Sequence, residues 1–327
     1  MVKFIVISVL ITVTIYFAIA LGLLLSQSPT ELGNMPTISF EATTSSALDD
    51  EVVLTNYTAR DGAQIGFRHF GATADDAPLV VLIHGSGWHG GSYTKIAEFL
   101  SANGDFEVLL PDLRGHGPNA AMRGDVAYIG QLEDDLADLI EAHLGDGQKL
   151  YVIGHSSGGG LAIRFAGGQY GQKLDKVVLM SPFLKYNAPT MRLNAGGWSI
   201  PLTRRIIGLT MLNSVGITLF NDMTVIQFNF PLAVLNGNQG YTATQSYSYR
   251  LNTSFAPRDD YLADIAKLPE FLLLVGANDD AFIADEFEPI MATATSTGQY
   301  KILPNVDHLG LINNPEANVL MLEFLQD

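Results

Sequence analysis

The chain has no cysteine among its 327 residues. This absence excludes disulfide bonds, thiolate nucleophiles and metal sites built on cysteine. It does not assign a compartment, because proteins without disulfides occur on both sides of a membrane. Basic residues are also scarce, with 18 against 34 acidic ones and a formal net charge of −16. Surfaces that bind nucleic acid are basic, so we expect no nucleic-acid partner.

Charged residues are also missing from the apolar run Phe4–Leu25. As a helix, this run would be about 33 Å long, enough to cross the hydrocarbon core of a bilayer. It has no polar face, unlike a globular helix, and it exceeds the roughly 7–15 apolar residues of a cleaved signal. We therefore expect residues 1–25 to form a signal anchor, a single transmembrane helix. Lys3 precedes the run, and the positive-inside rule then places the following chain in the periplasm or outside the cell. The alternative is secretion after cleavage, because Ala18-Ile19-Ala20 resembles a cleavage site.

The rest of the chain divides by its periodicity. Residues 26–50 are rich in Ser, Thr, Pro, Asp and Glu, and they are interpreted as a linker. Short apolar runs then alternate with helical patterns, which is typical of a parallel sheet covered on both faces. This alternation stops at Pro182 and resumes near residue 271. We expect a core of residues 51–182 and 259–327 with an insertion of residues 183–258. The predicted strands are 52–57, 64–70, 79–83, 106–110, 150–153, 176–180, 271–275 and 300–303.

One pentapeptide has the pattern of a catalytic turn. Gly154-His155-Ser156-Ser157-Gly158 follows an apolar strand and precedes a helical segment. Gly-x-Ser-x-Gly in this position is the nucleophile elbow, in which the two glycines leave room for a sharp turn that exposes the serine. We predict Ser156 as the nucleophile of a serine hydrolase. The alternative is a glycine-rich turn in which Ser156 only caps the helix.

A serine hydroxyl needs a base and a group that orients the base. In this architecture the order along the chain is serine, acid, histidine. Of the seven histidines, only His308 follows Ser156. Asp279 and Asp280 follow the predicted strand 271–275, and we favour Asp279 as the acid. Asp307 adjoins His308, and neighbouring side chains on an extended loop diverge.

The developing oxyanion needs two backbone N–H donors. One is expected at Ser157, directly after the nucleophile, and the other in the loop after strand 79–83. We place the second donor at Ser86 and treat His84, in the same loop, as a structural residue. This chemistry requires no metal or cofactor, and we expect none.

Five segments in succession resemble the landmarks of the α/β-hydrolase superfamily. The resemblance implies a mostly parallel, eight-stranded sheet with helices on both faces and a lid inserted after the sixth strand. It also implies a catalytic triad of Ser156, Asp279 and His308. Within the superfamily, the chain is similar to lysophospholipase- and monoacylglycerol-lipase-like esterases. The five segments are His84-Gly85-Ser86-Gly87, Asp112-Leu113-Arg114-Gly115-His116-Gly117, Gly154-His155-Ser156-Ser157-Gly158, Gly276-Ala277-Asn278-Asp279 and Asp307-His308.

The expected lid differs from the rest of the chain in charge. It has one acid, Asp222, against six bases, and it is apolar from Ile206 to Leu235. Two hypotheses follow: the apolar residues line a pocket for an acyl chain, and the bases face anionic lipid headgroups or a phosphate-bearing substrate. The alternatives are a core of the lid itself and scattered, solvated charges. Residues 206–220 are too short and too interrupted by polar residues to form a second span.

These features together predict a membrane-anchored serine esterase. It would cleave a carboxylic ester with an apolar acyl group, such as a lysophospholipid or monoacylglycerol, through an acyl-enzyme on Ser156. The first alternative is a peptidase or amidase with the same triad, although Asp222 is the only lid carboxylate that could bind a substrate ammonium group. The second is a non-catalytic binding protein of this fold. The sequence predicts no oligomeric state for the chain.

Overall fold

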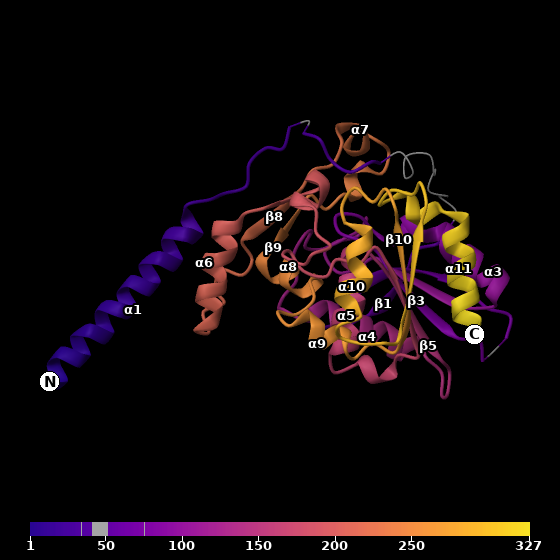
Figure 1. Cartoon of the computed structure of the whole chain (residues 1–327), viewed down its shortest axis with the longest axis horizontal. Helices are drawn as coiled ribbons and strands as arrows, with labels where there is room; N and C mark the ends of the chain where they lie inside the picture. Colours follow the sequence, from indigo (N-terminus) through magenta and orange to yellow (C-terminus); the bar gives the residue numbers. More distant parts are fainter. Residues whose placement is uncertain (34, 41–51, 75) are drawn as a thin grey trace.

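The computed structural model describes residues 1–33, 35–40, 52–74 and 76–327. Eight strands form one sheet in the order β1-β2-β4-β3-β5-β6-β10-β11 (Figure 1). β2 pairs antiparallel with β1 and β4, and the other neighbours are parallel. This α/β-hydrolase fold confirms the expectation, and the predicted strands agree to within three residues at each end. The strands are β1 Thr55–Thr58, β2 Gln64–Phe70, β3 Leu79–Ile83, β4 Glu107–Pro111, β5 Leu150–His155, β6 Lys176–Met180, β10 Glu270–Gly276 and β11 Gly298–Leu303.

Helices cover both faces of the sheet. Successive side chains of a strand point to opposite faces, and in β3 Val81 joins one buried cluster while Val80 joins the other. The first cluster includes side chains of α4, α5 and α10, and the second includes side chains of α3 and α11. Burial on both faces explains why the central strands β3, β4, β5, β6 and β10 are continuous apolar runs. The helices are α3 Thr94–Gly104, α4 Gln131–His143, α5 Ser157–Gly167, α10 Phe287–Met291 and α11 Pro315–Gln326.

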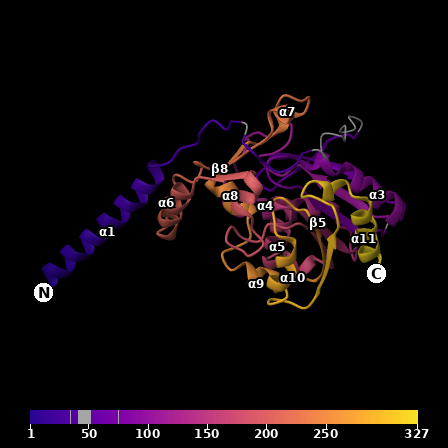
Figure 2. The ribbon, with the colours of Figure 1, turned by 45° about the horizontal axis from the view of Figure 1, so that its top comes forward.

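The chain leaves the sheet after β6 and returns at β10. Residues 183–258, which we call the inserted segment, lie beside the sheet (Figure 2) and share a buried cluster with it through side chains such as Phe228 and Tyr247. Its three strands pair antiparallel in the order β7-β8-β9. The insertion therefore lies where the alternation of strands and helices stops in the sequence. Its elements are β7 Ser199–Pro201, α6 Thr203–Ser214, β8 Thr224–Phe228, α7 Leu232–Leu235, β9 Ser246–Ser248 and α8 Tyr249–Phe255, and α9 Tyr261–Ile265 leads back to the core.

The apolar N-terminal helix is present as α1 (Val2–Leu25), which projects away from the sheet domain (Figures 1 and 2). Among the described residues it is the one helix long and apolar enough to cross a membrane, a test that a signal sequence also passes. Its C-terminal half packs against α6, where Ala20 and Leu24 are buried. A Cβ added at Gly208 would lie 2.6 Å from the Ala20 carbonyl oxygen. The two helices therefore approach closely at small residues.

Part of the predicted linker also packs on the inserted segment. The Asn229 amide donates to the carbonyl oxygens of Met35 and Pro36, at 3.1 and 3.2 Å. The backbone N–H of Ser39 donates to the Asp280 carboxylate at 2.7 Å, and Ile38 is buried. Residues 35–40 therefore lie against the domain, and the linker residues 41–50 fall outside the described residues.

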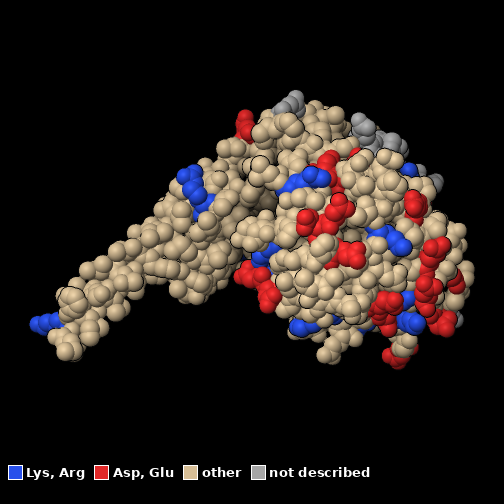
Figure 3. Space-filling model, in the orientation of Figure 1, with Lys and Arg blue, Asp and Glu red and all other residues tan. Residues whose placement is uncertain are grey.

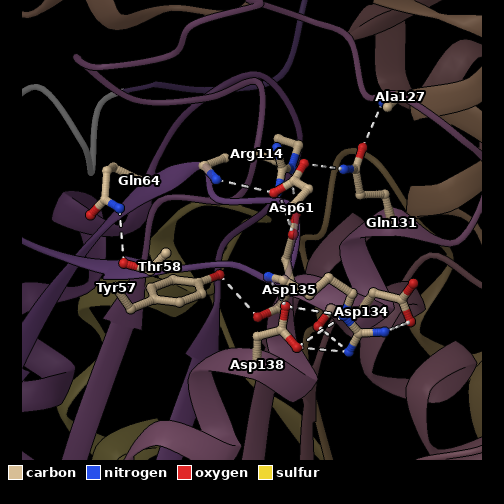
Figure 4. Close-up of polar contacts among 12 residues, drawn as sticks. Tyr57, Thr58, Asp61, Gln64, Arg114, Ala127, Gln131, Asp134, Asp135 and Asp138 are labelled. Atoms are coloured by element: carbon tan, nitrogen blue, oxygen red, sulfur yellow. Dashed lines mark hydrogen bonds and ion pairs between the residues drawn. The ribbon is translucent and has the colours of Figure 1, made fainter.

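A cluster of ion pairs fixes the loop after β4 (Figure 4). Arg114 in this loop binds Asp61, in the β1–β2 turn, at 3.0 Å and Asp135, in α4, at 2.7 Å. Tyr57 of β1 donates to the backbone carbonyl of Asp135 at 2.9 Å. Because the Arg114 and Asp135 side chains are largely buried, the pairing is well shielded from solvent. The loop that carries His116 is thus held between the first hairpin and α4.

Candidate active site

Ser156 lies in a strained turn between β5 and α5. Its φ and ψ are 55° and −122°, a region that non-glycine residues rarely occupy and that is typical of functional turns. The turn brings Gly158 directly against the carbonyl oxygens of Ile83 and His84, and Gly154 against Gly158, so that a side chain at either glycine would collide with backbone. These contacts give the physical reason for both glycines of the pentapeptide.

The structure brings Asp279 and His308 together at the ends of two neighbouring strands. Asp279 follows β10 and His308 follows β11, and their Oδ2 and Nδ1 atoms are 2.9 Å apart. The other Asp279 oxygen accepts from the backbone N–H groups of Ala281 and Phe282, at 2.9 and 2.7 Å. Asp280 instead binds the linker at Ser39. Asp279, and not Asp280, is therefore the carboxylate that contacts the imidazole of His308.

Burial and pairing act in opposite directions on these two groups. Burial raises the pKa of Asp279, but the charge of His308 and the hydrogen bonds from His308 and Phe282 outweigh it and lower that pKa to about 2. Burial lowers the pKa of His308, and the Asp279 carboxylate outweighs it, so that this pKa is raised. With Nδ1–H on Asp279, the other ring nitrogen of His308 is free to act as a base.

Ser156 and His308 border the same two cavities. The Ser156 hydroxyl makes no hydrogen bond to the described residues, His308 included. Catalytic hydrogen bonds are often long without substrate and tighten when it binds. The arrangement thus places the predicted nucleophile and the predicted base on one cavity without a hydrogen bond between them.

A second histidine supports the His308 loop. His155 is fully buried, and burial lowers its pKa to about 3, so the ring is neutral. Its Nδ1 accepts from the Tyr93 hydroxyl at 2.8 Å, and its Nε2–H donates to the His308 carbonyl at 3.2 Å. The same Tyr93 oxygen accepts the Gly85 N–H at 3.2 Å. His155 therefore connects the loop of the base to the loop after β3.

The loop after β3 presents Ser86 between two fixed neighbours. His84 donates from Nδ1 to the Gly85 carbonyl at 2.7 Å. The Gly87 N–H donates to the Tyr247 hydroxyl at 2.7 Å, and this hydroxyl donates to His116 Nε2 at 2.6 Å. The Ser86 N–H itself has no hydrogen-bond acceptor among the described residues. It is the available donor of this loop.

The Ser157 N–H is the second available donor. It lies in the first turn of α5, where helical N–H groups have no acceptor within the helix. Ser86, Ser156 and Ser157 border one small cavity of about 70 Å³. The structure thus places Ser86, Ser156, Ser157 and His308 on the lining of one cavity, with Asp279 bound to Nδ1 of His308. Tyr93 and Tyr247 were not singled out, because no motif marks them and their contacts join distant parts of the chain. His155 occupies a variable position of the pentapeptide, which assigns it no role.

A larger, mostly apolar cavity of about 460 Å³ opens at Ser156. Its walls include Trp198 and Phe230 of the inserted segment and Trp88 of the loop after β3. Ile38 and Phe40, from the predicted linker, complete the wall, with the Phe40 ring 5.6 Å from that of Trp198. Among the described residues, neither this cavity nor the smaller one is lined by Asp or Glu. The cavity is therefore suited to an uncharged, apolar group.

Half of the six bases of the inserted segment are neutralised within the molecule. Lys185, Arg250 and Arg258 pair with core carboxylates at 2.7 Å or less. Arg192 donates to the backbone carbonyls of Asp279 and Phe282. The three ion-paired bases thus attach the segment to the acidic core, whereas Arg204 and Arg205 have no carboxylate partner among the described residues. Among the described residues, no cluster of three His, Asp or Glu side chains could hold a metal ion.

Comparison with known proteins shows which family and which proteins the chain resembles. Residues 74–315 match the family model Hydrolase_4, described as serine aminopeptidase, S33. A Mycobacterium tuberculosis protein is 35% identical over 124 residues, which are 36% of this chain and 32% of that protein. A monoacylglycerol lipase of Mycolicibacterium smegmatis is 30% identical over 37% of this chain and 43% of its own length. The chain thus spans less than half the length of these curated relatives.

The solved structures agree with the fold. The monoacylglycerol lipase of Paleococcus ferrophilus superposes with a TM-score of 0.59 and 20% sequence identity. The superposition covers 81% of this chain and 99% of that one. At this identity the likeness supports the architecture of the sheet and helices, and it leaves the substrate to be argued from the site.

Proposed function

Because the chain belongs to the Hydrolase_4 family of α/β hydrolases, whose model matches residues 74–315, we propose that it is a serine hydrolase that cleaves carboxylic esters with an apolar acyl group. The observation that supports this proposal most is the cavity of about 460 Å³ at Ser156. Its size is within the range of small-molecule sites. Its aromatic and aliphatic walls carry no carboxylate among the described residues, as a neutral acyl chain requires.

In the proposed mechanism, His308 removes the proton from Ser156, whose oxygen attacks the ester carbonyl. Asp279 holds the Nδ1–H tautomer and stabilises the imidazolium that forms. The N–H groups of Ser86 and Ser157 donate to the oxyanion of the tetrahedral intermediate. His308 then protonates the leaving alcohol, and a water molecule, deprotonated by the same ring, hydrolyses the acyl-enzyme.

The second candidate is a peptidase, because the family description names an aminopeptidase. An aminopeptidase must bind the ammonium group of its substrate, and buried charges are normally paired with an opposite charge. The described lining offers no Asp or Glu for this purpose. The lack of a lining carboxylate among the described residues favours an ester substrate over an aminoacyl amide.

A substrate panel distinguishes the two candidates. Purified full-length protein is assayed with p-nitrophenyl esters of increasing acyl length and with aminoacyl p-nitroanilides. We expect turnover of the esters, with a maximum at a medium or long acyl chain, and little or none of the anilides. Preferential turnover of aminoacyl anilides would overturn the ester assignment in favour of the peptidase.

We also propose that α1 anchors the protein in a membrane, with the catalytic domain on the extracytoplasmic side. The packing of Tyr16, Ala20 and Leu24 against α6 supports retention of the helix, because cleavage after Ala20 would remove part of this contact. Intact-mass measurement of protein from the membrane fraction tests this point. A mass that lacks the first 20 residues would favour the secreted alternative.

A further inference from the structure

Helix α6 runs antiparallel beside the C-terminal half of α1, and two hydrogen bonds fix its position. At its start, the Arg204 N–H donates to the Gln27 side chain at 2.9 Å. Near its end, the Tyr16 hydroxyl donates to the Met211 carbonyl at 2.7 Å. Figures 1 and 2 both show α6 between α1 and the sheet domain. If α1 crosses a membrane, the depth of α6 in that membrane therefore follows from its position along α1.

That depth reaches well into a bilayer if α1 crosses one. Tyr16 precedes Leu25 by nine residues, which is about 14 Å along a helix. The hydrocarbon core is about 30 Å thick. The end of α6 then lies near the middle of the bilayer, on the premise of the anchoring proposed above. The rest of the sheet domain lies on the side of Leu25.

The composition of α6 and the following turn fits this environment. Residues 206–221 contain no charged side chain, and charges return only with Arg204, Arg205 and Asp222 at their ends. Val215 and Leu219 expose 52% and 79% of their surface. Figure 3 shows the projecting part as almost free of charged atoms, in contrast to the sheet domain. In water these exposed apolar side chains would be unfavourable.

Several polar groups at the end of α6 are paired within the turn, although the backbone N–H groups of Thr218, Leu219 and Phe220 have no acceptor among the described residues. Asn213 and Asn221 exchange two side-chain hydrogen bonds, at 2.7 and 2.8 Å. The hydroxyl of Ser214 donates to the Met211 carbonyl at 2.8 Å. The Ile217 N–H donates back to Leu212 at 2.9 Å. Such internal pairing lowers the cost of placing backbone and amide groups in hydrocarbon.

We propose that residues 206–221 form a re-entrant hairpin immersed in the phospholipid leaflet that surrounds the C-terminal half of α1. The hairpin enters and leaves on the same side, in agreement with its being too short to cross. Arg204, exposed and without a side-chain partner among the described residues, lies at the level of the lipid phosphates. β8, which follows the hairpin, carries Ile226 and Phe228 to the small cavity at Ser156. A hairpin immersed in the membrane is thus directly followed by a strand that forms part of the wall of the small cavity.

The absence of cysteine makes the test direct, because a single cysteine can be introduced and labelled. Leu219→Cys reports on the hairpin. Leu193→Cys is the matched control, a leucine of the same inserted segment that is 88% exposed and lies outside residues 206–221. Ile11→Cys reports on the anchor. Each full-length variant is labelled with the fluorophore NBD and reconstituted in phosphatidylcholine vesicles. Quenching by doxyl-labelled phosphatidylcholine and by aqueous iodide is then measured.

We expect the label at 219 to be quenched by doxyl lipid and protected from iodide, like the label at 11, and the label at 193 to show the reverse. If 11 is quenched by lipid and 219 behaves like 193, the anchor is correct and the hairpin is overturned. If 219 is protected from iodide but not quenched by lipid, a second copy of the chain covers this face, which also overturns the proposal. If 11 is not quenched by lipid, the anchoring premise fails, whereas fluorophosphonate labelling of the same samples reports separately on the hydrolase.

Discussion

Tyr247→Phe is the substitution that tests most specifically how the inserted segment supports the reaction. The Tyr247 hydroxyl accepts the Gly87 N–H and donates to His116 Nε2, and both contacts are buried. Burial holds the pKa of His116 well below its usual range, so its ring is neutral and accepts this proton. Removing the hydroxyl leaves a buried donor and a buried acceptor without partners. The peptide group beside Ser86 then loses its fixed position.

The magnitude follows from these two contacts. Each unpaired buried group costs about 1–3 kcal/mol, and both together about 2–5 kcal/mol because they share one site. A domain of this size then melts about 5–15 °C lower and stays folded. Loss of an oxyanion donor lowers kcat by about 10²–10³-fold. A displaced donor retains part of its effect, so we expect kcat to fall by about 10–100-fold with a smaller change in KM.

The assay is ester turnover alongside a thermal melt, with Tyr241→Phe as the control. Tyr241 lies in the same inserted segment and is 66% exposed, so removal of its hydroxyl changes neither kcat nor melting temperature. A Tyr247→Phe protein that melts lower but retains its full kcat would refute the reasoning. Tyr247 would then stabilise the fold without positioning Ser86.

Three further predictions concern the base, the cavity and the buried histidines. Asp279 raises the pKa of His308 above 6.5, so kcat/KM should rise with pH through a value above 6.5. Asp279→Asn should shift that rise to lower pH and lower kcat about 10⁴-fold. An unchanged pH profile would contradict the pairing of the two residues. Phe40→Ala removes part of the cavity wall and enlarges the cavity, so the preferred acyl chain of p-nitrophenyl esters should lengthen. An unaltered acyl-length profile would exclude Phe40 from the substrate site. Burial lowers the pKa of His84 and of His155 from 6.5 to about 3 in the folded protein. The free energy of unfolding should therefore be highest above pH 6.5 and decrease as the pH falls below it. Equal melting temperatures at pH 7 and pH 5 would show that these rings are not held neutral.

The central strands of the sheet were predictable because they are buried on both faces and are therefore continuous apolar runs in the sequence. Leu79–Ile83 and Lys176–Met180 have the predicted bounds. The elbow was equally local, since two glycines and a serine define it within five residues. Asp279 followed from its place after a strand, and its contact with His308 depends on neighbouring parallel strands ending at one edge of the sheet.

Long-range contacts were beyond the sequence. Tyr247 reaches Gly87 across 160 positions, and neither residue lies in a pattern that signals the other. The polar composition of residues 26–50 predicted a linker, yet Ile38 packs into the cavity wall because Gly196 and Gly197 allow the backbones to approach. The excess of bases in the inserted segment was visible, but their acidic partners come from the core, which only the fold brings near.

Labelling of the full-length protein with a fluorophosphonate, with Ser156→Ala as the comparison, tests the central claim most directly. The probe reacts with an activated serine and forms a stable adduct whose mass identifies the modified peptide. We predict one adduct, on the peptide that contains Ser156, and the loss of both labelling and ester turnover in Ser156→Ala. Ester turnover that persists in Ser156→Ala, or an adduct on another serine, would contradict the account.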